Sequence, residues 1–304
     1  MKSLLIAIAI LCALPSQVLA STCPSPPVPL RLLVPNSEYI LIGRITSIEE
    51  TTVENYTRLT ATFEVNNVLQ GRIKSKTISL YLDNWMELQL AESESDEGRM
   101  LVFINASEDD VDFYYPSAFR DSYKKLDEQG LNAYRQRIKE LQGINAIKDE
   151  KRRDQLTVDW LINCATNRYT YWEGAYDLSP AGSFLEYYDY ETDEFIPRIK
   201  LSFKQKQRIR ASVLSQTKIT YIELGLIMTL VDGPDPELLR FMMKTLKSTA
   251  TEYLYRQQGL MRQITVMSER QDLSDALAEI NTIDYDDDYE KRINKIAQTF
   301  INKL

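Results

Sequence analysis

The hydrophobic period of this chain changes once, near Asp121, and that change limits the possible folds more than any other feature. Before it, apolar and polar residues alternate, as in residues 60–65, where Ala61, Phe63 and Val65 share one side. Strict alternation is typical of half-buried strands. After it, apolar residues recur every three or four positions, which is typical of amphipathic helices. We therefore predict an α+β protein with separate halves.

The first half, residues 21–118, carries five short strand patterns separated by turns. They are residues 39–45, 60–65, 77–82, 100–104 and 112–115. Gly43 lies inside the first pattern and indicates a bulge or a bend. Five strands without a helical pattern between them favour a small OB-like antiparallel β-barrel. The preceding residues 24–35 are rich in proline, so we expect no regular structure there.

The second half, residues 119–304, has the pattern of an antiparallel helical array. Asp235, Pro236 and Glu237 form a helix start, with an N-cap residue, a proline at the first position and an acid in the first turn. From Phe203 onward, helix starts recur at a short and regular interval, as in HEAT-like repeats or bundles. Gly143 is a candidate C-cap, and residues 169–197 are interpreted as a long connection within this half.

The amino terminus predicts export. Lys2 precedes an apolar run over residues 4–14, and Val18, Leu19 and Ala20 provide a small-residue cleavage site. This pattern indicates a signal peptide over residues 1–20, which places the protein in the periplasm or outside the cell. The most apolar later segment, residues 219–231, is interrupted by polar residues, so we predict no transmembrane segment.

Composition excludes several function classes. The chain has no histidine, so Ser-His-Asp and Cys-His catalysis and His-ligated zinc are impossible. Its net charge of −8 argues against nucleic acid as a partner. No motif indicates a cofactor or a metal site. We predict a protein that is not an enzyme; the alternative is a hydrolase that uses two carboxylates, for example on glycans.

Two cysteines remain after removal of the signal peptide, Cys23 and Cys164. In an exported protein they are candidates for a disulfide. Alternatively, Cys164 packs as a small apolar residue on its helix stripe. Lipid attachment at Cys23 is less compatible with the sequence, because the three preceding residues depart from a bacterial lipobox.

Two polar segments are candidate sites. Arg168, Trp172 and Glu173 predict an interaction loop with an aromatic and ionic pocket; the alternative is that they anchor the loop after the helix that contains Cys164. The acidic residues 284–290 superficially resemble a calcium loop. However, Tyr289 replaces the glycine that an EF-hand needs, so we interpret them as a solvated loop.

The order of segments in the first half resembles a known family. Residues 38–48 read EYILIGRITSI, residues 62–71 read TFEVNNVLQG, residues 77–80 read TISL, and residues 98–103 read GRMLVF. This order is similar to the netrin-like module of exported bacterial proteins and of the tissue inhibitors of metalloproteinases, over about residues 23–115. The resemblance implies an OB-fold barrel.

One departure limits what the resemblance implies about function. The inhibitors chelate zinc with the free amino group of a terminal cysteine, whereas the expected terminus here is Ser21. Protease inhibition would therefore need another mechanism. Because the chain has no catalytic constellation and no histidine, protein–protein binding is the predicted function.

Overall fold

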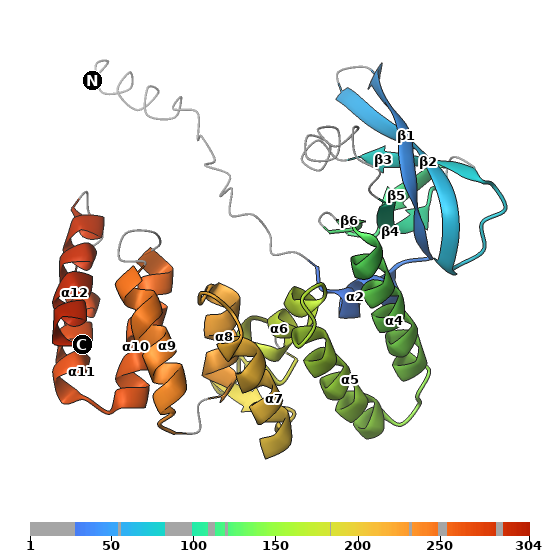
Figure 1. Cartoon of the computed structure of the whole chain (residues 1–304). Helices are drawn as coiled ribbons and strands as arrows, with labels where there is room; N and C mark the ends of the chain where they lie inside the picture. The colour runs from blue at the N-terminus through green and yellow to red at the C-terminus, as the bar shows by residue number, and fades with distance from the viewer. Residues whose placement is uncertain are drawn as a thin grey trace, which may run out of the picture.

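The computed structural model describes residues 28–53, 56–82, 99–108, 113–118, 121–182, 184–230, 233–248, 254–283 and 288–304. They form a closed β-barrel followed by a row of helices (Figure 1). The predicted α+β class with separate halves is therefore confirmed. None of the helices in the described ranges combines the length and the apolar character needed to cross a membrane.

The barrel contains the five predicted strands, most of them longer than the sequence pattern. They are β1 Tyr39–Val53, β2 Tyr56–Gln70, β3 Thr77–Leu82, β4 Arg99–Ala106 and β5 Phe113–Pro116. Their order is β1-β2-β3-β5-β4, and pairing of β1 with β4 closes the barrel. The β3–β5 pair is parallel and the others are antiparallel. This is an OB-like arrangement in which one pair departs from the expected antiparallel pattern.

Two strands are buried on both faces, which explains their continuous apolar sequences. Val102 and Ile104 of β4 belong to the barrel interior. Leu101 and Phe103, on the opposite face of β4, pack in the core that continues into the helices. Ile42 of β1 lies in the same core.

Gly43 lies at a register shift between β1 and β2, as the sequence predicts. A Cβ atom at this position would lie 2.0 Å from the carbonyl oxygen of Glu64. Only glycine permits this approach of the two backbones, because any other residue would collide with the neighbouring strand.

The proline-rich lead contains a helix, so the expectation of no regular structure there is wrong. Helix α2 spans Leu30–Asn36, follows Pro29 at the N-cap position and buries Leu30, Leu33 and Val34. Proline is tolerated at the start of a helix, where its missing N–H has no intrahelical acceptor to lose. Pro35 lies in the last turn, and the helix ends at the next residue.

The sheet also continues past residue 118, where the first half was expected to end. Strand β6, Tyr123–Leu126, pairs antiparallel with β4. The helical pattern begins only after it, at α4.

The second half is a succession of helices, each packed on at least one other helix (Figure 1). They are α4 Glu128–Asn145, α5 Glu150–Ala165, α6 Tyr171–Leu178, α7 Phe203–Leu214, α8 Tyr221–Leu230, α9 Pro236–Ser248, α10 Leu254–Ser268, α11 Gln271–Ala278 and α12 Tyr289–Lys303. Short 3₁₀ helices span Pro180–Gly182 and Glu279–Thr282.

Side-chain caps fix several helix starts. Asp127 accepts the N–H of Gly130 at α4, and Asp149 accepts that of Arg152 at α5. Asp235 Oδ1 accepts the N–H groups of Glu237 and Leu238 at α9, both at 3.1 Å, so the predicted helix start is confirmed. The predicted C-cap at Gly143 is wrong, because α4 continues to Asn145.

Residues 169–197 are more structured than the expected connection. They contain α6, the first 3₁₀ helix and an antiparallel hairpin of β7 Glu186–Asp189 with β8 Glu194–Pro197.

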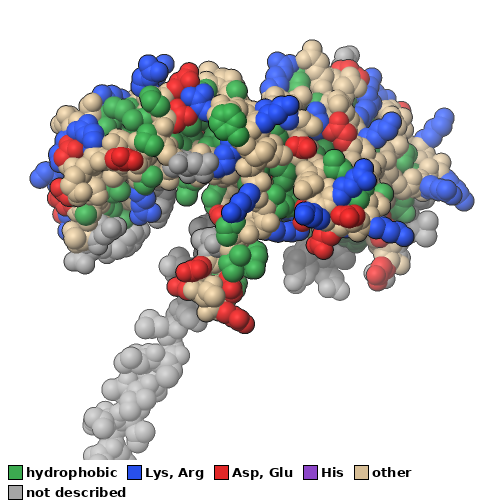
Figure 2. All heavy atoms as spheres, turned by 90° about the horizontal axis from the view of Figure 1, so that it is seen from below, with side chains coloured by type: hydrophobic (Ala, Val, Ile, Leu, Met, Phe, Trp, Pro, Cys, Tyr) green, Lys and Arg blue, Asp and Glu red, His purple; other side chains and the backbone are tan. Residues whose placement is uncertain are grey.

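The face of the molecule shown in Figure 2 carries charged side chains of both signs, with apolar side chains between them.

Candidate functional site

Helix α6 is held in place by a buried carboxylate, Glu173, which is 1% exposed. Its Oε1 accepts the hydroxyl of Tyr134 at 2.8 Å and lies 3.0 Å from Lys124 Nζ. Its Oε2 accepts the backbone N–H of Leu30 at 2.6 Å. Buried charges need such partners because desolvation is costly. One side chain of α6 thus contacts α2, β6 and α4.

A second carboxylate, Asp177, lies one turn further along α6 and is fully buried. Arg31 of α2 donates to both of its oxygens, at 2.7 Å and 2.9 Å. The Arg31 guanidinium also lies 4.8 Å from the ring centre of Phe184. Burial raises the pKa of Asp177, and the bonds from Arg31 act in the opposite direction. We call Arg31, Lys124, Tyr134, Glu173 and Asp177 the α6 ion cluster.

A close backbone contact fixes a third side of α6. A Cβ atom on Gly174 would lie 2.1 Å from the carbonyl oxygen of Leu161 and 2.5 Å from the nitrogen of Ala165. Only a residue without a side chain lets α6 pack this closely on α5.

The remaining side of α6 presents aromatic residues. Trp172 and Tyr176 are four residues apart and therefore lie on one face of the helix. Their rings stack, with centroids 5.1 Å apart and an interplanar angle of 23°. Tyr176 also lines a groove between α6 and α8.

We call this feature the α6–α8 groove. Its volume is about 190 Å³, and its apolar and aromatic lining consists of Tyr176, Pro180, Tyr221, Ile222, Leu224 and Met228. Tyr221 is 63% exposed and Met228 is 47% exposed, which is high for large apolar side chains.

The floor of the groove is closely packed. Gly225 of α8 faces Ser179, and a Cβ atom on this glycine would lie 2.7 Å from the Cβ of Ser179. The hydroxyl of Thr229 donates to the carbonyl oxygen of Leu178 at 2.8 Å. These contacts join α8 to the carboxyl end of α6.

The three residues of the predicted interaction loop are separated in the structure. Trp172 lies on the aromatic face of α6, whereas Glu173 points into the buried ion cluster. Arg168 donates to Gln129 at 2.7 Å and also to the hydroxyl of Tyr169, over whose ring its guanidinium lies. Arg168 therefore anchors the loop before α6 to the start of α4.

Sequence reasoning missed Arg31, Lys124, Tyr176, Asp177 and Tyr221. The spacing of four between Trp172 and Tyr176, with Glu173 and Asp177 at the same spacing, is a helical signal that could have revealed α6. No comparable local signal links Arg31 to Asp177, because they are 146 residues apart.

Cys164 is fully buried in the helical core, and burial raises the pKa of its thiol. This burial is compatible with both sequence alternatives, a disulfide and a free cysteine that packs as a small apolar residue. Cys23 lies outside the described residues, so the disulfide between the two stays a prediction.

Of the acidic residues 284–290, residues 284–287 lie outside the described residues, so their interpretation as a solvated loop stays a prediction. A second acidic stretch, residues 186–194, lies in the β7–β8 hairpin, where Tyr190 is 89% exposed. Within the described ranges, no three Cys, Asp or Glu side chains gather as metal ligands do.

Comparisons with protein-family models, with curated proteins and with solved structures gave no match. The α6–α8 groove and the α6 ion cluster behind it are therefore the features from which a function can be argued.

Proposed function

We propose that this chain is an exported protein that acts by binding another protein and not by catalysis. The observation that carries this proposal is the size and lining of the α6–α8 groove. Its volume of about 190 Å³ is smaller than that of sites for small molecules, which measure roughly 300–1,000 Å³. It is suited to one bulky side chain, the kind of anchor that dominates the binding energy of protein interfaces.

The lining specifies the partner's anchor. Among the described residues, no charged side chain lines the groove, and Tyr176, Tyr221 and Met228 offer apolar faces. An apolar or proline side chain on an extended segment of the partner would be complementary. The hydroxyl groups of the two tyrosines would form hydrogen bonds with the partner's backbone.

The α6 ion cluster supports binding over hydrolysis. Glu173 and Asp177 are a pair of carboxylates, as the alternative of a hydrolase requires, but both are buried and already bonded to Lys124, Tyr134 and Arg31. Carboxylates engaged in this way stabilise the junction of α6 with α2 and β6 and do not reach a substrate.

We also infer that the barrel is a netrin-like module and that residues 1–20 direct export to the periplasm or beyond. The OB-like strand order supports the first inference. The apolar sequence of residues 4–14 behind Lys2 supports the second.

Site-specific photo-crosslinking tests the proposed function. A photoreactive phenylalanine analogue replaces Tyr221 in the groove or, as a control, Phe203 of α7, which is 79% exposed. We expect a reproducible protein adduct from position 221 in the native exported fraction and none from position 203. The identified partner is then purified, and its affinity is measured by calorimetry.

The affinity measurements decide the outcome. Tyr221→Ser and Met228→Asp should weaken binding at least about tenfold, and Phe203→Ser should leave it unchanged. Equal adducts from both positions, or an affinity indifferent to the groove substitutions, would refute the proposal.

A further inference from the structure

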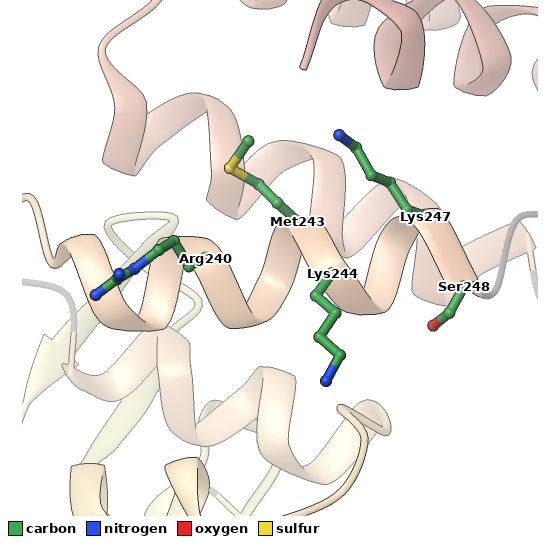
Figure 3. Close-up of a pocket in the computed structure, with 5 residues that line it drawn as sticks. All are labelled: Arg240, Met243, Lys244, Lys247 and Ser248. Atoms are coloured by element: carbon green, nitrogen blue, oxygen red, sulfur yellow. The ribbon is translucent and has the colours of Figure 1, made fainter.

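A second surface, on α9, has a different chemistry from the groove. Arg240, Lys244 and Lys247 are all exposed and follow the spacing i, i+4, i+7, which aligns them on one face of the helix. We call them the α9 cationic stripe. At 1.5 Å per residue it extends over about 10 Å. Figure 3 shows the three side chains projecting from α9.

The stripe lies opposite the face by which α9 packs in the protein. Leu238, Met242 and Leu246 are buried, and α9 packs against α10. Because these residues fix the rotation of α9 about its axis, the cations point to solvent.

Ion pairs among the described residues do not neutralise the stripe. Glu237 and Asp235, the acids at the start of α9, are both bonded to Arg210 of α7. Arg240 donates to the carbonyl oxygen of Pro236. Among the described residues, no carboxylate lies within ion-pair distance of Arg240, Lys244 or Lys247.

The shape of this surface indicates the kind of ligand. The stripe borders a shallow hollow of about 540 Å³ that is also lined by Met243 and Ser248. The charged ends of Arg240, Lys244 and Lys247 lie apart and do not converge on one point (Figure 3). A single small anion would meet only one cation, whereas a chain with several carboxylates would meet all three.

The geometry points to a docking site on α9 for an acidic segment of a partner polypeptide. Carboxylates spaced along that segment pair with the three cations, and an apolar side chain between them covers Met243. A short acidic segment is favoured over nucleic acid or an anionic membrane because it need not extend beyond the stripe, whereas the net charge of −8 repels a polyanionic surface that covers more of the chain. This inference goes beyond the proposed function and does not depend on the α6–α8 groove.

Fluorescence anisotropy with a labelled deca-glutamate peptide tests the proposal on the full chain. Lys244→Glu with Lys247→Glu reverses two charges of the stripe. The matched control, Lys151→Glu with Arg152→Glu, makes the same change of charge at two exposed residues of α5. We expect the stripe variant to bind at least about tenfold more weakly and the control to stay within about twofold of the parent. Binding should weaken as salt rises from about 0.02 M to about 0.15 M.

Several results would overturn the proposal. They are no binding at the lower salt concentration, equal weakening by both variants, or tighter stripe-dependent binding to single-stranded DNA or to phosphatidylglycerol vesicles than to the peptide. Salt-sensitive self-association abolished by the stripe variant would assign the surface to a second copy instead. Tyr221→Ser, which disrupts the groove, should leave peptide binding unchanged, so failure here is distinct from failure of the proposed function.

Discussion

The carboxylate of Glu173 accepts the backbone N–H of Leu30 at 2.6 Å, although 143 residues separate them along the chain. Leu30 is the first residue of α2, and Pro29 before it provides no side-chain cap. The first N–H groups of a helix have no intrahelical acceptor, and negative charge is favoured beside them. Glu173 therefore takes the role of a capping residue from a distant part of the sequence.

Replacing Glu173 by alanine should strongly destabilise the protein. The substitution leaves Lys124, the Tyr134 hydroxyl and the Leu30 N–H without their acceptor in a buried place, and such losses cost about 3–5 kcal/mol. Urea denaturation followed by circular dichroism measures the change. The control is Glu64→Ala, because Glu64 forms an exposed pair with Arg44 and should cost at most about 1 kcal/mol. Similar losses for both variants would contradict the assigned role.

Arg31 and Asp177 should show strong energetic coupling. Arg31→Met leaves the fully buried carboxylate of Asp177 unpaired and should cost about 3–5 kcal/mol. Asp177→Leu leaves the Arg31 guanidinium unpaired, but that side chain is 22% exposed, so the cost should be smaller. The double variant should cost clearly less than the sum, because it buries no unpaired charge. A double-mutant cycle in urea measures the coupling. Additive losses would show that the bidentate contact contributes nothing to stability.

Two glycines should respond oppositely to alanine. Gly174→Ala places a Cβ against the backbone of α5, so we expect a loss of at least about 2 kcal/mol. Gly143→Ala meets no atom within 4 Å inside α4, and the higher helix propensity of alanine should add about 0.5–1 kcal/mol. Thermal unfolding compares the two. If Gly174→Ala unfolded at the same temperature as the parent, the close packing of α6 on α5 would be contradicted.

The contribution of Asp235 should depend on pH. Hydrogen bonds from Arg210 and from the backbone lower the pKa of Asp235 from 3.8 to about 2 in the folded protein. A folded pKa below the unfolded value stabilises the protein above about pH 4, and this contribution is lost as the pH falls toward 2. Asp235→Asn keeps the N-cap geometry but removes the charge.

The difference in unfolding free energy between the parent and Asp235→Asn should therefore be constant from pH 7 to about pH 5. It should then shrink between about pH 4 and pH 2. Urea titrations at several pH values measure it. A difference that does not change over this interval would exclude the charge of Asp235 as the cause.

The barrel was largely predictable because its strands carry strong local patterns. Residues 77–82 were located without error, and Gly43 marks the bulge at which β1 changes register with β2. The start of α9 was equally clear, since Asp235 and Pro236 are local signals. The lengths of β1 and β2 were underestimated, because their outer ends extend beyond the alternating pattern.

The candidate site was not predictable to the same degree. Glu173 and Asp177 resemble exposed acids in a loop, and only the distant partners Arg31, Lys124 and Tyr134 make their burial favourable. Helix α2 was missed for the same reason, since proline predicts irregular structure locally while burial of Leu30 and Leu33 stabilises a helix. Tyr221 and Tyr176 form a groove only after α6 and α8 pack together.

The continuous core that runs from Leu101 and Phe103 of the barrel to Phe300 of the last helix has a consequence for how this molecule could be divided. The barrel shares this core with the helices, so it could not be removed or transferred to another protein without destabilising the rest of the chain. A cut near residue 118 would expose Ile42 and Phe103 on one fragment and leave Leu131 and Ile138 uncovered on the other. The folding stability of each half therefore depends on the presence of the other.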